Sequence, residues 1–315
     1  MKNTERITEV WTFINNIKNW DEESFDWNKA YVASIFSKIA YLHIPEYELK
    51  NANRANLIPC IEYREIVKSN GISNISEILR SSNFGDYFIV ERPYVIAVVV
   101  KVKNVLFISM RGTQQLHDWL INLNVLKSRP YPNKNVDIFL HKGFHRAAVS
   151  CINEISSEIL KRYGEDNKIY ITGHSLGGAL AAILHGLWNE RSYNFIAIND
   201  FKSIIRLRMN ERFRTHSCYV FGMPRYGNFH AMEYFASPFH IYNQADIVPT
   251  VPPKILGFHD SLIEYCLNSE GKIDQSNIKG NSFAKFVFRL VTLKVIREHD
   301  IELYMSRVGS VINVN

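Results

Sequence analysis

Ser175 is the residue of this chain whose surroundings best predict chemistry. It is the centre of the sequence GHSLG, residues 173–177, which separates an apolar, strand-like segment from an apolar, helical one. A serine on such a sharp turn presents its hydroxyl above a sheet edge, and the flanking glycines remove side chains that would collide there. The first N–H groups of the next helix face the oxygen on which charge develops. We therefore expect Ser175 to be a nucleophile and the N–H of Leu176 to stabilise an oxyanion, the alternative being a glycine-rich turn with an incidental serine.

A serine hydroxyl becomes nucleophilic only when a histidine removes its proton and a carboxylate orients that histidine. On elbows of this kind the chain order is serine, acid, histidine. Asp246 is the best acid candidate, because it directly follows a predicted strand, lies among apolar residues and precedes the stiffening Pro249. The competing acids are Asp200, Asp260 and Asp274. Residue types alone do not separate the two candidate bases, His259 and His299.

Strands alternate with helices along most of the chain, which indicates an α/β fold with a mostly parallel central sheet flanked by helices. The predicted strands are 94–102 and 105–110, joined as a hairpin at Lys103-Asn104, and 168–172, 218–221 and 239–242. The predicted helices are 7–17, 28–42, 144–163 (capped by Gly164) and 176–188. We expect one domain over residues 1–315, with a helical segment, 1–85, packed on a catalytic core, 86–315.

Several segments together resemble the class 3 lipases, the fungal-type triacylglycerol lipases of the α/β-hydrolase fold. These segments are GHSLGGAL (173–180), MRGT (110–113) followed by Asp118-Trp119, HKGF (141–144), FGMPRYGN (221–228) and NQADIVP (243–249). They occur in the family's order and span about residues 90–305. The resemblance implies Asp246 as the acid. It also implies His299 as the base, because REHDIELY (297–304) is similar to the family's last histidine segment, with a tyrosine five residues on, whereas His259 matches a position that is typically non-catalytic.

The same resemblance implies two further parts of the site. Thr113 is the expected second donor to the oxyanion. A lid is expected within residues 114–140, where the apolar residues include Leu116, Trp119, Leu120 and Leu123. Such a segment can cover an acyl groove and open at a lipid surface. The alternative is a fixed helix packed on the core.

The implied activity is hydrolysis of lipid carboxylic esters, as in an acylglycerol lipase, through an acyl-enzyme and without a metal or organic cofactor. A phospholipase A1 acting on membrane phospholipids, as an exported effector, would share every one of these motifs. A non-catalytic lipid-surface binding protein is a third hypothesis. Residues 283–293 favour a core helix by their apolar spacing, and neighbouring lysines and arginines make peripheral contact with an anionic membrane the alternative. We expect no nucleic-acid partner, and the sequence leaves the oligomeric state open.

Composition supports a globular protein. The chain has 315 residues, of which 46% are hydrophobic, and a formal net charge of +6. Its four cysteines are far apart, which favours dispersed buried thiols over disulfides. Lys2, Glu5 and Arg6 occupy positions where a signal peptide would need an apolar core. From this we expect a cytoplasmic protein, the alternative being export by a signal-independent route.

Overall fold

The computed structural model describes most of the chain. The described residues are 10–11, 13–42, 75, 79, 86–92, 94–112, 125–131, 135–190, 195–198, 203–206, 214–274 and 297–313. Within them, residues 10–11 and 13–16 are helical, so the first predicted helix (7–17) ends one residue earlier than expected. The predicted helix at 283–293 lies outside the described residues.

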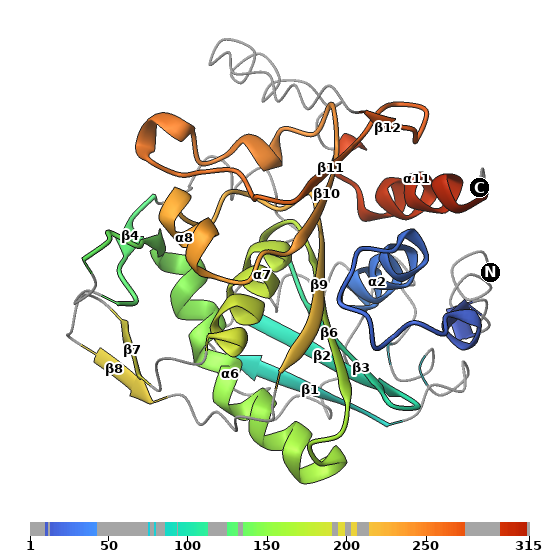
Figure 1. Ribbon diagram of the computed structural model, residues 1–315, viewed down its shortest axis with the longest axis horizontal. Helices are drawn as coiled ribbons and strands as arrows, with labels where there is room; N and C mark the ends of the chain where they lie inside the picture. Colours follow the sequence, from blue (N-terminus) through green and yellow to red (C-terminus); the bar gives the residue numbers. More distant parts are fainter. Residues whose placement is uncertain are drawn as a thin grey trace, which may run out of the picture.

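An eight-stranded sheet forms the centre of the molecule, in the order β1-β2-β3-β6-β9-β10-β11-β12 (Figure 1). Its strands are β1 (Tyr87–Arg92), β2 (Val95–Val102), β3 (Val105–Met110), β6 (Lys168–His174), β9 (Thr215–Phe221), β10 (Phe239–Asn243), β11 (Glu264–Leu267) and β12 (Ile273–Asp274). Pairing is parallel from β3 to β11 and antiparallel at both margins. The predicted hairpin is confirmed, with Lys103 at a φ of 56° in its turn.

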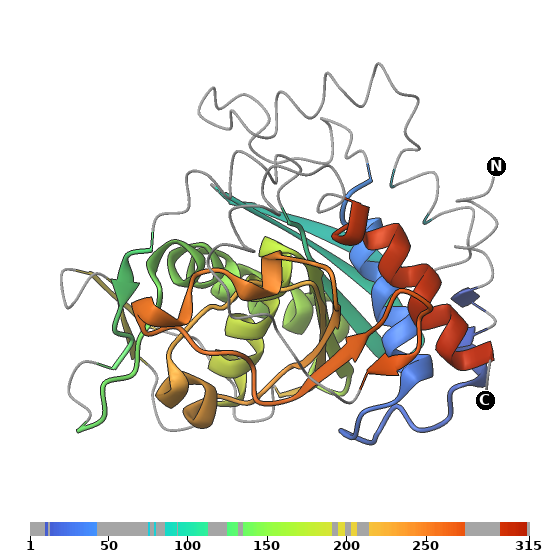
Figure 2. The ribbon, with the colours of Figure 1, turned by 90° about the horizontal axis from the view of Figure 1, so that it is seen from above.

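Helices cover both faces of this sheet. Figure 2 shows α2 (Trp27–Ile39) and α11 (Ile301–Asn313) on one face, and α6 (Lys142–Tyr163) and α7 (Leu176–Asn189) on the other. A separate apolar core fills each side, because alternate residues of the strands point to opposite faces. Gly164 caps α6 as predicted, at a φ of 72°. The sheet is therefore buried on both sides, which leaves its edges to carry polar chemistry.

The remaining elements are short. They are β4 (Lys127–Ser128), β5 (Leu140–His141), β7 (Phe195–Ile198), β8 (Ser203–Arg206), α8 (Phe229–Tyr234) and the 3-10 turns η2 (Val248–Thr250) and η3 (Lys254–Leu256). Cys151, Cys218 and Cys266 are buried and form no disulfide with one another, as the spacing of the cysteines predicted, and Cys60 lies outside the described residues. Because β6, β9 and β10 are parallel, the segments that follow them meet at one edge of the sheet, and the candidate site lies there.

Candidate active site

Ser175 stands at a strained turn between β6 and α7. Its φ of 60° and ψ of −134° are rarely adopted by a residue with a side chain, and such strain is typical of a nucleophile elbow. The turn requires the two glycines, since a Cβ on Gly173 would lie 2.3 Å from the carbonyl oxygen of Gly177. The Ser175 N–H donates to the carbonyl of Phe221 at 2.9 Å, which fixes the turn to β9. The chain thus holds the Ser175 side chain at the carboxyl edge of the sheet.

Asp246 and His299, which are 53 residues apart in the sequence, meet in a buried hydrogen bond. His299 Nδ1 donates to Asp246 Oδ2 at 2.6 Å. The other carboxylate oxygen, Oδ1, accepts from the N–H of Val248 at 2.9 Å, which fixes the carboxylate plane. Because the carboxylate holds the proton on Nδ1, the neutral imidazole keeps a lone pair on Nε2. That lone pair is what a general base requires.

Tyr304 also belongs to this cluster, although sequence reasoning gave it no role. Its hydroxyl donates to Asp246 Oδ2 at 2.6 Å and accepts from the N–H of Asn243 at 3.0 Å. Burial, and then the charge of Asp246, raise the pKa of Tyr304 well above its ordinary value, so the hydroxyl keeps its proton. Asn243 Nδ2 also donates to the carbonyl of Glu298, next to His299, at 2.8 Å. Tyr304 and Asn243 therefore join the acid loop to the histidine segment.

His174, the residue before the nucleophile, holds the backbone of His299. Its Nε2–H donates to the His299 carbonyl at 2.6 Å, and its Nδ1 accepts from the Tyr41 hydroxyl at 3.0 Å. Burial, and then the neighbouring His299, lower the pKa of His174 well below its ordinary value. The imidazole is therefore neutral, as this donor and acceptor pattern requires.

Ser175 Oγ and His299 Nε2 are both buried, and neither has a hydrogen-bond partner within the described part of the chain. Ser175 and His299 are close to each other, because Ser175 directly follows His174. The ring centroids of His174 and His299 are 4.5 Å apart. A Cβ placed on Gly222, which follows the Phe221 that holds Ser175, would lie 3.1 Å from His299 Cε1. No hydrogen bond joins the hydroxyl and the imidazole in this structure. Catalytic hydrogen bonds often close only when substrate is bound.

The described residues include Leu176, one of the two expected hydrogen-bond donors to the oxyanion. Leu176 is the first residue of α7, where backbone N–H groups have no acceptor within the helix. The loop before Thr113 presses on the elbow, since a Cβ on Gly177 would lie 2.7 Å from the nitrogen of Gly112. Thr113 itself lies outside the described residues. So do the lid residues Leu116, Trp119, Leu120 and Leu123, and the lid stays a prediction.

The competing acids and bases lie in other environments. His259 is half-exposed, and its Nδ1 contacts the carbonyl of Asp260 at 2.9 Å. Asp260 forms ion pairs with Arg225 at 2.7 Å and Lys254 at 2.5 Å. Asp274 is in β12, and Asp200 lies outside the described residues. The structure therefore brings together Asp246 and His299, and not the alternatives.

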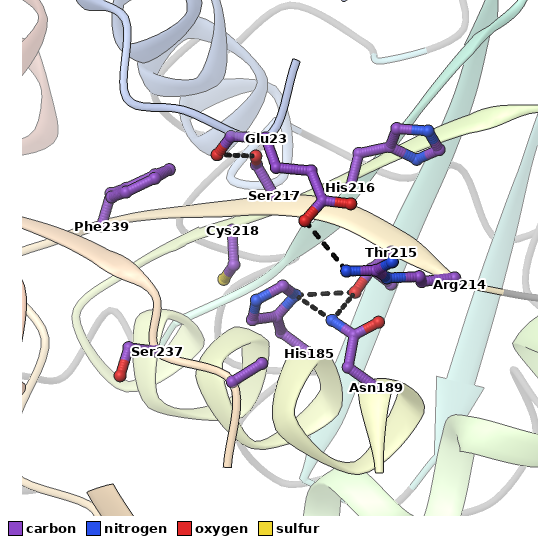
Figure 3. A pocket seen from close by; sticks show the side chains of 11 residues that line it. Glu23, His185, Asn189, Arg214, Thr215, His216, Ser217, Cys218, Ser237 and Phe239 are labelled. Atoms are coloured by element: carbon purple, nitrogen blue, oxygen red, sulfur yellow. Dashed lines mark hydrogen bonds and ion pairs between the residues drawn. The ribbon is translucent and has the colours of Figure 1, made fainter. Parts of the chain in front are cut away.

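A cavity of about 420 Å³ lies at the other end of α7, away from Ser175 (Figure 3). His185 lines it and contacts the Thr215 hydroxyl through Nδ1 at 2.7 Å. Arg214, at its rim, pairs with Glu23 at 2.9 Å. Burial lowers the pKa of His185 to about 3, so this histidine is neutral at ordinary pH. The cavity has no residue in common with the Ser175 region.

Among the described residues, no group of three or more histidine, cysteine or acidic side chains is arranged to hold a metal ion. No helix within the described ranges combines the length and the apolar character needed to cross a membrane.

Part of the chain is similar to a known protein family. Residues 107–256 match the model of the family "Lipase (class 3)", a segment that contains Ser175 and Asp246. This match supports a relationship of the chain to the class 3 lipases. A secreted mono- and diacylglycerol lipase of Fusarium solani is 24% identical over 182 residues, which cover 53% of this chain and 45% of the relative. The lipase of Rhizomucor miehei is 27% identical over 166 residues, covering 51% and 41% respectively. The chain thus spans less than half the length of these class 3 relatives.

A chloroplastic phospholipase A1 of Arabidopsis thaliana is also similar, with 33% identity over 99 residues that cover 30% of this chain and 14% of the relative. Its match is the shortest of the three.

Solved lipase structures share the fold. Lipase II from Rhizopus niveus superposes with a TM-score of 0.53 at 19% identity, covering 86% of this chain and 91% of that one. A triacylglycerol lipase with a serine protease triad as its catalytic centre gives a TM-score of 0.55 at 17% identity, covering 86% and 92%. The predicted α/β-hydrolase fold, with a mostly parallel sheet flanked by helices, is confirmed.

The predicted cytoplasmic location is wrong. Two relatives, from Fusarium solani and Malassezia globosa, are named as secreted mono- and diacylglycerol lipases, which points to an extracellular location. The prediction rested on charged residues within 1–20, which lie apart from the lipase segment, 107–256. Those charges report the composition of one segment, and they do not determine where a hydrolase of this family acts.

Proposed function

We propose that this protein hydrolyses carboxylic ester bonds of acylglycerols through a Ser175-His299-Asp246 triad. The observation that carries the proposal is the buried hydrogen bond between His299 Nδ1 and Asp246 Oδ2, close to a serine on a strained elbow. This arrangement supplies a nucleophile, a base with a free lone pair and a fixed counter-charge.

In the first half of the reaction, Ser175 Oγ attacks the ester carbonyl while His299 Nε2 takes the hydroxyl proton. Asp246 stabilises the resulting imidazolium, and the N–H groups of Leu176 and Thr113 donate to the oxyanion. As the tetrahedral intermediate collapses, the C–O bond to glycerol breaks and the imidazolium returns its proton to the leaving oxygen. An acyl-enzyme on Ser175 remains.

The second half uses the same groups on water. His299 takes a proton from a water molecule, whose oxygen attacks the acyl carbonyl. Collapse releases the fatty acid and restores the hydroxyl of Ser175. One ester bond and one water are consumed, and one alcohol and one acid are formed.

Acylglycerols are the preferred substrate class because the longer matches are to lipases, and the Fusarium relative is named for mono- and diacylglycerols. Phospholipase A1 activity is the second candidate, supported by the shorter match to the Arabidopsis enzyme. A hydrolysis series tests both: p-nitrophenyl esters from short to long acyl chains, then diolein, triolein and phosphatidylcholine. We expect long-chain esters and diolein to be cleaved. Cleavage of phosphatidylcholine alone would favour the phospholipase, and cleavage of short soluble esters alone would contradict both lipid substrates.

A further inference from the structure

Two apolar side chains project into solvent from the loop that follows the acid. Ile255 is 93% exposed and its neighbour Leu256 is 40% exposed. Both belong to η3, and we refer to this pair as the apolar tip. Isoleucine is among the most often buried residue types. An almost fully exposed isoleucine on an ordered turn therefore indicates a site that another surface covers.

Two further exposed apolar side chains, Leu126 and Phe229, lie near the loop that carries the tip. A Cβ on Gly257, the residue after the tip, would lie 3.4 Å from Lys127 Nζ, which places β4 and the exposed Leu126 beside it. The exposed ring of Phe229 lies 5.1 Å from the ring of His259, in the same loop as the tip. Figures 1 and 2 both show the loop 251–262 next to β4. The loop that carries the tip thus has other exposed apolar residues in its neighbourhood.

The tip is held rigidly by a buried arginine. Arg225 Nη1 donates to the carbonyls of Thr250 and Pro252, the latter at 2.9 Å, and its Nε pairs with Asp260 at 2.7 Å. The Arg225 N–H also donates to the carbonyl of Val251 at 2.7 Å. Both ends of the loop are thus fixed to one residue, which lowers the entropic cost of presenting the tip.

The charge around the tip is positive. Lys254 pairs with Asp260, which Arg225 also contacts, so these three groups have a net charge of +1. Lys127 adds a second positive charge, with its Nζ 4.2 Å from the centroid of the Phe139 ring. Lysines that flank exposed isoleucine and leucine are the chemistry of a surface that binds anionic lipid.

We propose that the apolar tip and its flanking lysines dock this protein on an anionic lipid surface. The inference rests on the proposed function, because an enzyme that cleaves lipid esters must meet them at an interface. The position supports it: the loop that ends in the tip begins after Asp246, at the same sheet edge as Ser175. Ile255 and Leu256 insert among the acyl chains, while Lys254 and Lys127 contact anionic headgroups.

Vesicle sedimentation tests the proposal directly. Ser175→Ala protein, which should not consume the lipid, is mixed with phosphatidylcholine vesicles with or without phosphatidylglycerol. Adding Ile255→Ser should weaken binding to both about tenfold, since it removes most of the buried area of one side chain. Lys254→Gln should weaken binding to the phosphatidylglycerol vesicles about fivefold. Ile255→Leu, and Lys161→Gln on the exposed end of α6, should bind as the parent protein does.

Turnover of soluble p-nitrophenyl butyrate, measured in the Ser175-containing proteins, separates the two claims. Ile255→Ser should hydrolyse this ester at the wild-type rate, because an exposed side chain does not shape the site. Equal vesicle binding by Ile255→Ser and its parent, or no vesicle binding at all, would overturn the docking surface even if the ester is cleaved. If the wild type does not hydrolyse the ester, the proposed function is overturned, whatever the result of the vesicle-binding measurements.

Discussion

Asp246 receives three hydrogen bonds, and two of the donors come from residues without a predicted role. His299 and Tyr304 both donate to Oδ2 at 2.6 Å, and the Val248 N–H donates to Oδ1 at 2.9 Å. A carboxylate with this many fixed donors has little freedom to rotate away from the imidazole. At the scale of single residues, the position of the Asp246 carboxylate therefore depends on Tyr304 nearly as much as on His299.

Replacing Tyr304 by phenylalanine tests this dependence. The variant loses a hydrogen bond to a charged group, so we expect turnover (kcat) to fall about tenfold and stability to fall by about 2 kcal/mol. KM should change little, because Tyr304 contacts no substrate in this account. Tyr170→Phe is the matched control, since its hydroxyl also donates inside the core, to the carbonyl of Trp20 at 2.8 Å, at the other end of β6. Equal losses of turnover in the two variants would contradict the role of Tyr304.

Gly222 provides a second test at this scale. Its φ is +54°, and a Cβ there would lie 2.8 Å from Asp246 Oδ2 and 2.9 Å from the Tyr304 hydroxyl. We expect Gly222→Ala to displace the carboxylate and lower turnover about a hundredfold. Gly164→Ala is the control, because Gly164 also has a positive φ, +72°, but nothing lies within 4 Å of a Cβ there. If both variants keep full turnover in steady-state assays, the close contact at Gly222 does not affect catalysis.

At the scale of elements, the site depends on β6 meeting the segment before α11. His174 makes this connection, because it ends β6 and donates to the carbonyl of His299. Tyr41, just beyond α2, holds the other nitrogen of His174. The hydrogen bonds of the His174 imidazole thus join three segments from distant parts of the chain.

We expect His174→Phe, which keeps the ring volume and loses both hydrogen bonds, to lower turnover about tenfold and stability by about 2 kcal/mol. His185→Phe is its matched control at the opposite end of α7, where His185 contacts Thr215. That variant should lose stability, measured by urea unfolding, and keep its turnover. Unchanged turnover in His174→Phe would show that the histidine segment needs no support from β6.

The elements that could be predicted from the sequence are those with local signals. The hairpin turn at Lys103, the cap at Gly164 and the elbow at Ser175 each have a distinctive residue at a distinctive position. β11 and β12 were missed because they have only four and two residues at the sheet margin. Tyr304 and Asn243 were missed as site residues because their partners lie about 60 residues away. Such contacts follow from which segments meet in space, and residue spacing along the chain does not encode them.

At the scale of the whole molecule, the sheet is covered on both faces, and several histidines are buried without charge. His145, in α6, contacts the Ser128 hydroxyl through Nδ1 at 2.9 Å, and burial lowers its pKa to about 4. In the unfolded chain the same imidazole titrates near 6.5. Between these values only the unfolded state binds the proton, so acid favours unfolding. The contribution of His145 is complete above pH 6.5 and is lost as the pH falls toward 4.

Urea unfolding at several pH values checks this linkage. Over pH 6.5 to 4, we expect the wild type to lose up to about 1.4 kcal/mol per pH unit through His145 alone. His145→Gln should show a shallower decline by that amount, although it starts from a lower stability. Parallel curves for the two proteins would contradict burial of a neutral His145.

The most direct test of the central claim is labelling with a fluorophosphonate, followed by mass spectrometry of the peptide that contains residue 175. We predict that the wild type is labelled at Ser175, that Ser175→Ala is not labelled, and that His299→Ala reacts about a thousandfold more slowly. His259→Ala should react at the wild-type rate. Labelling at another serine, or loss of reactivity in His259→Ala with His299→Ala unaffected, would contradict the Ser175-His299-Asp246 triad.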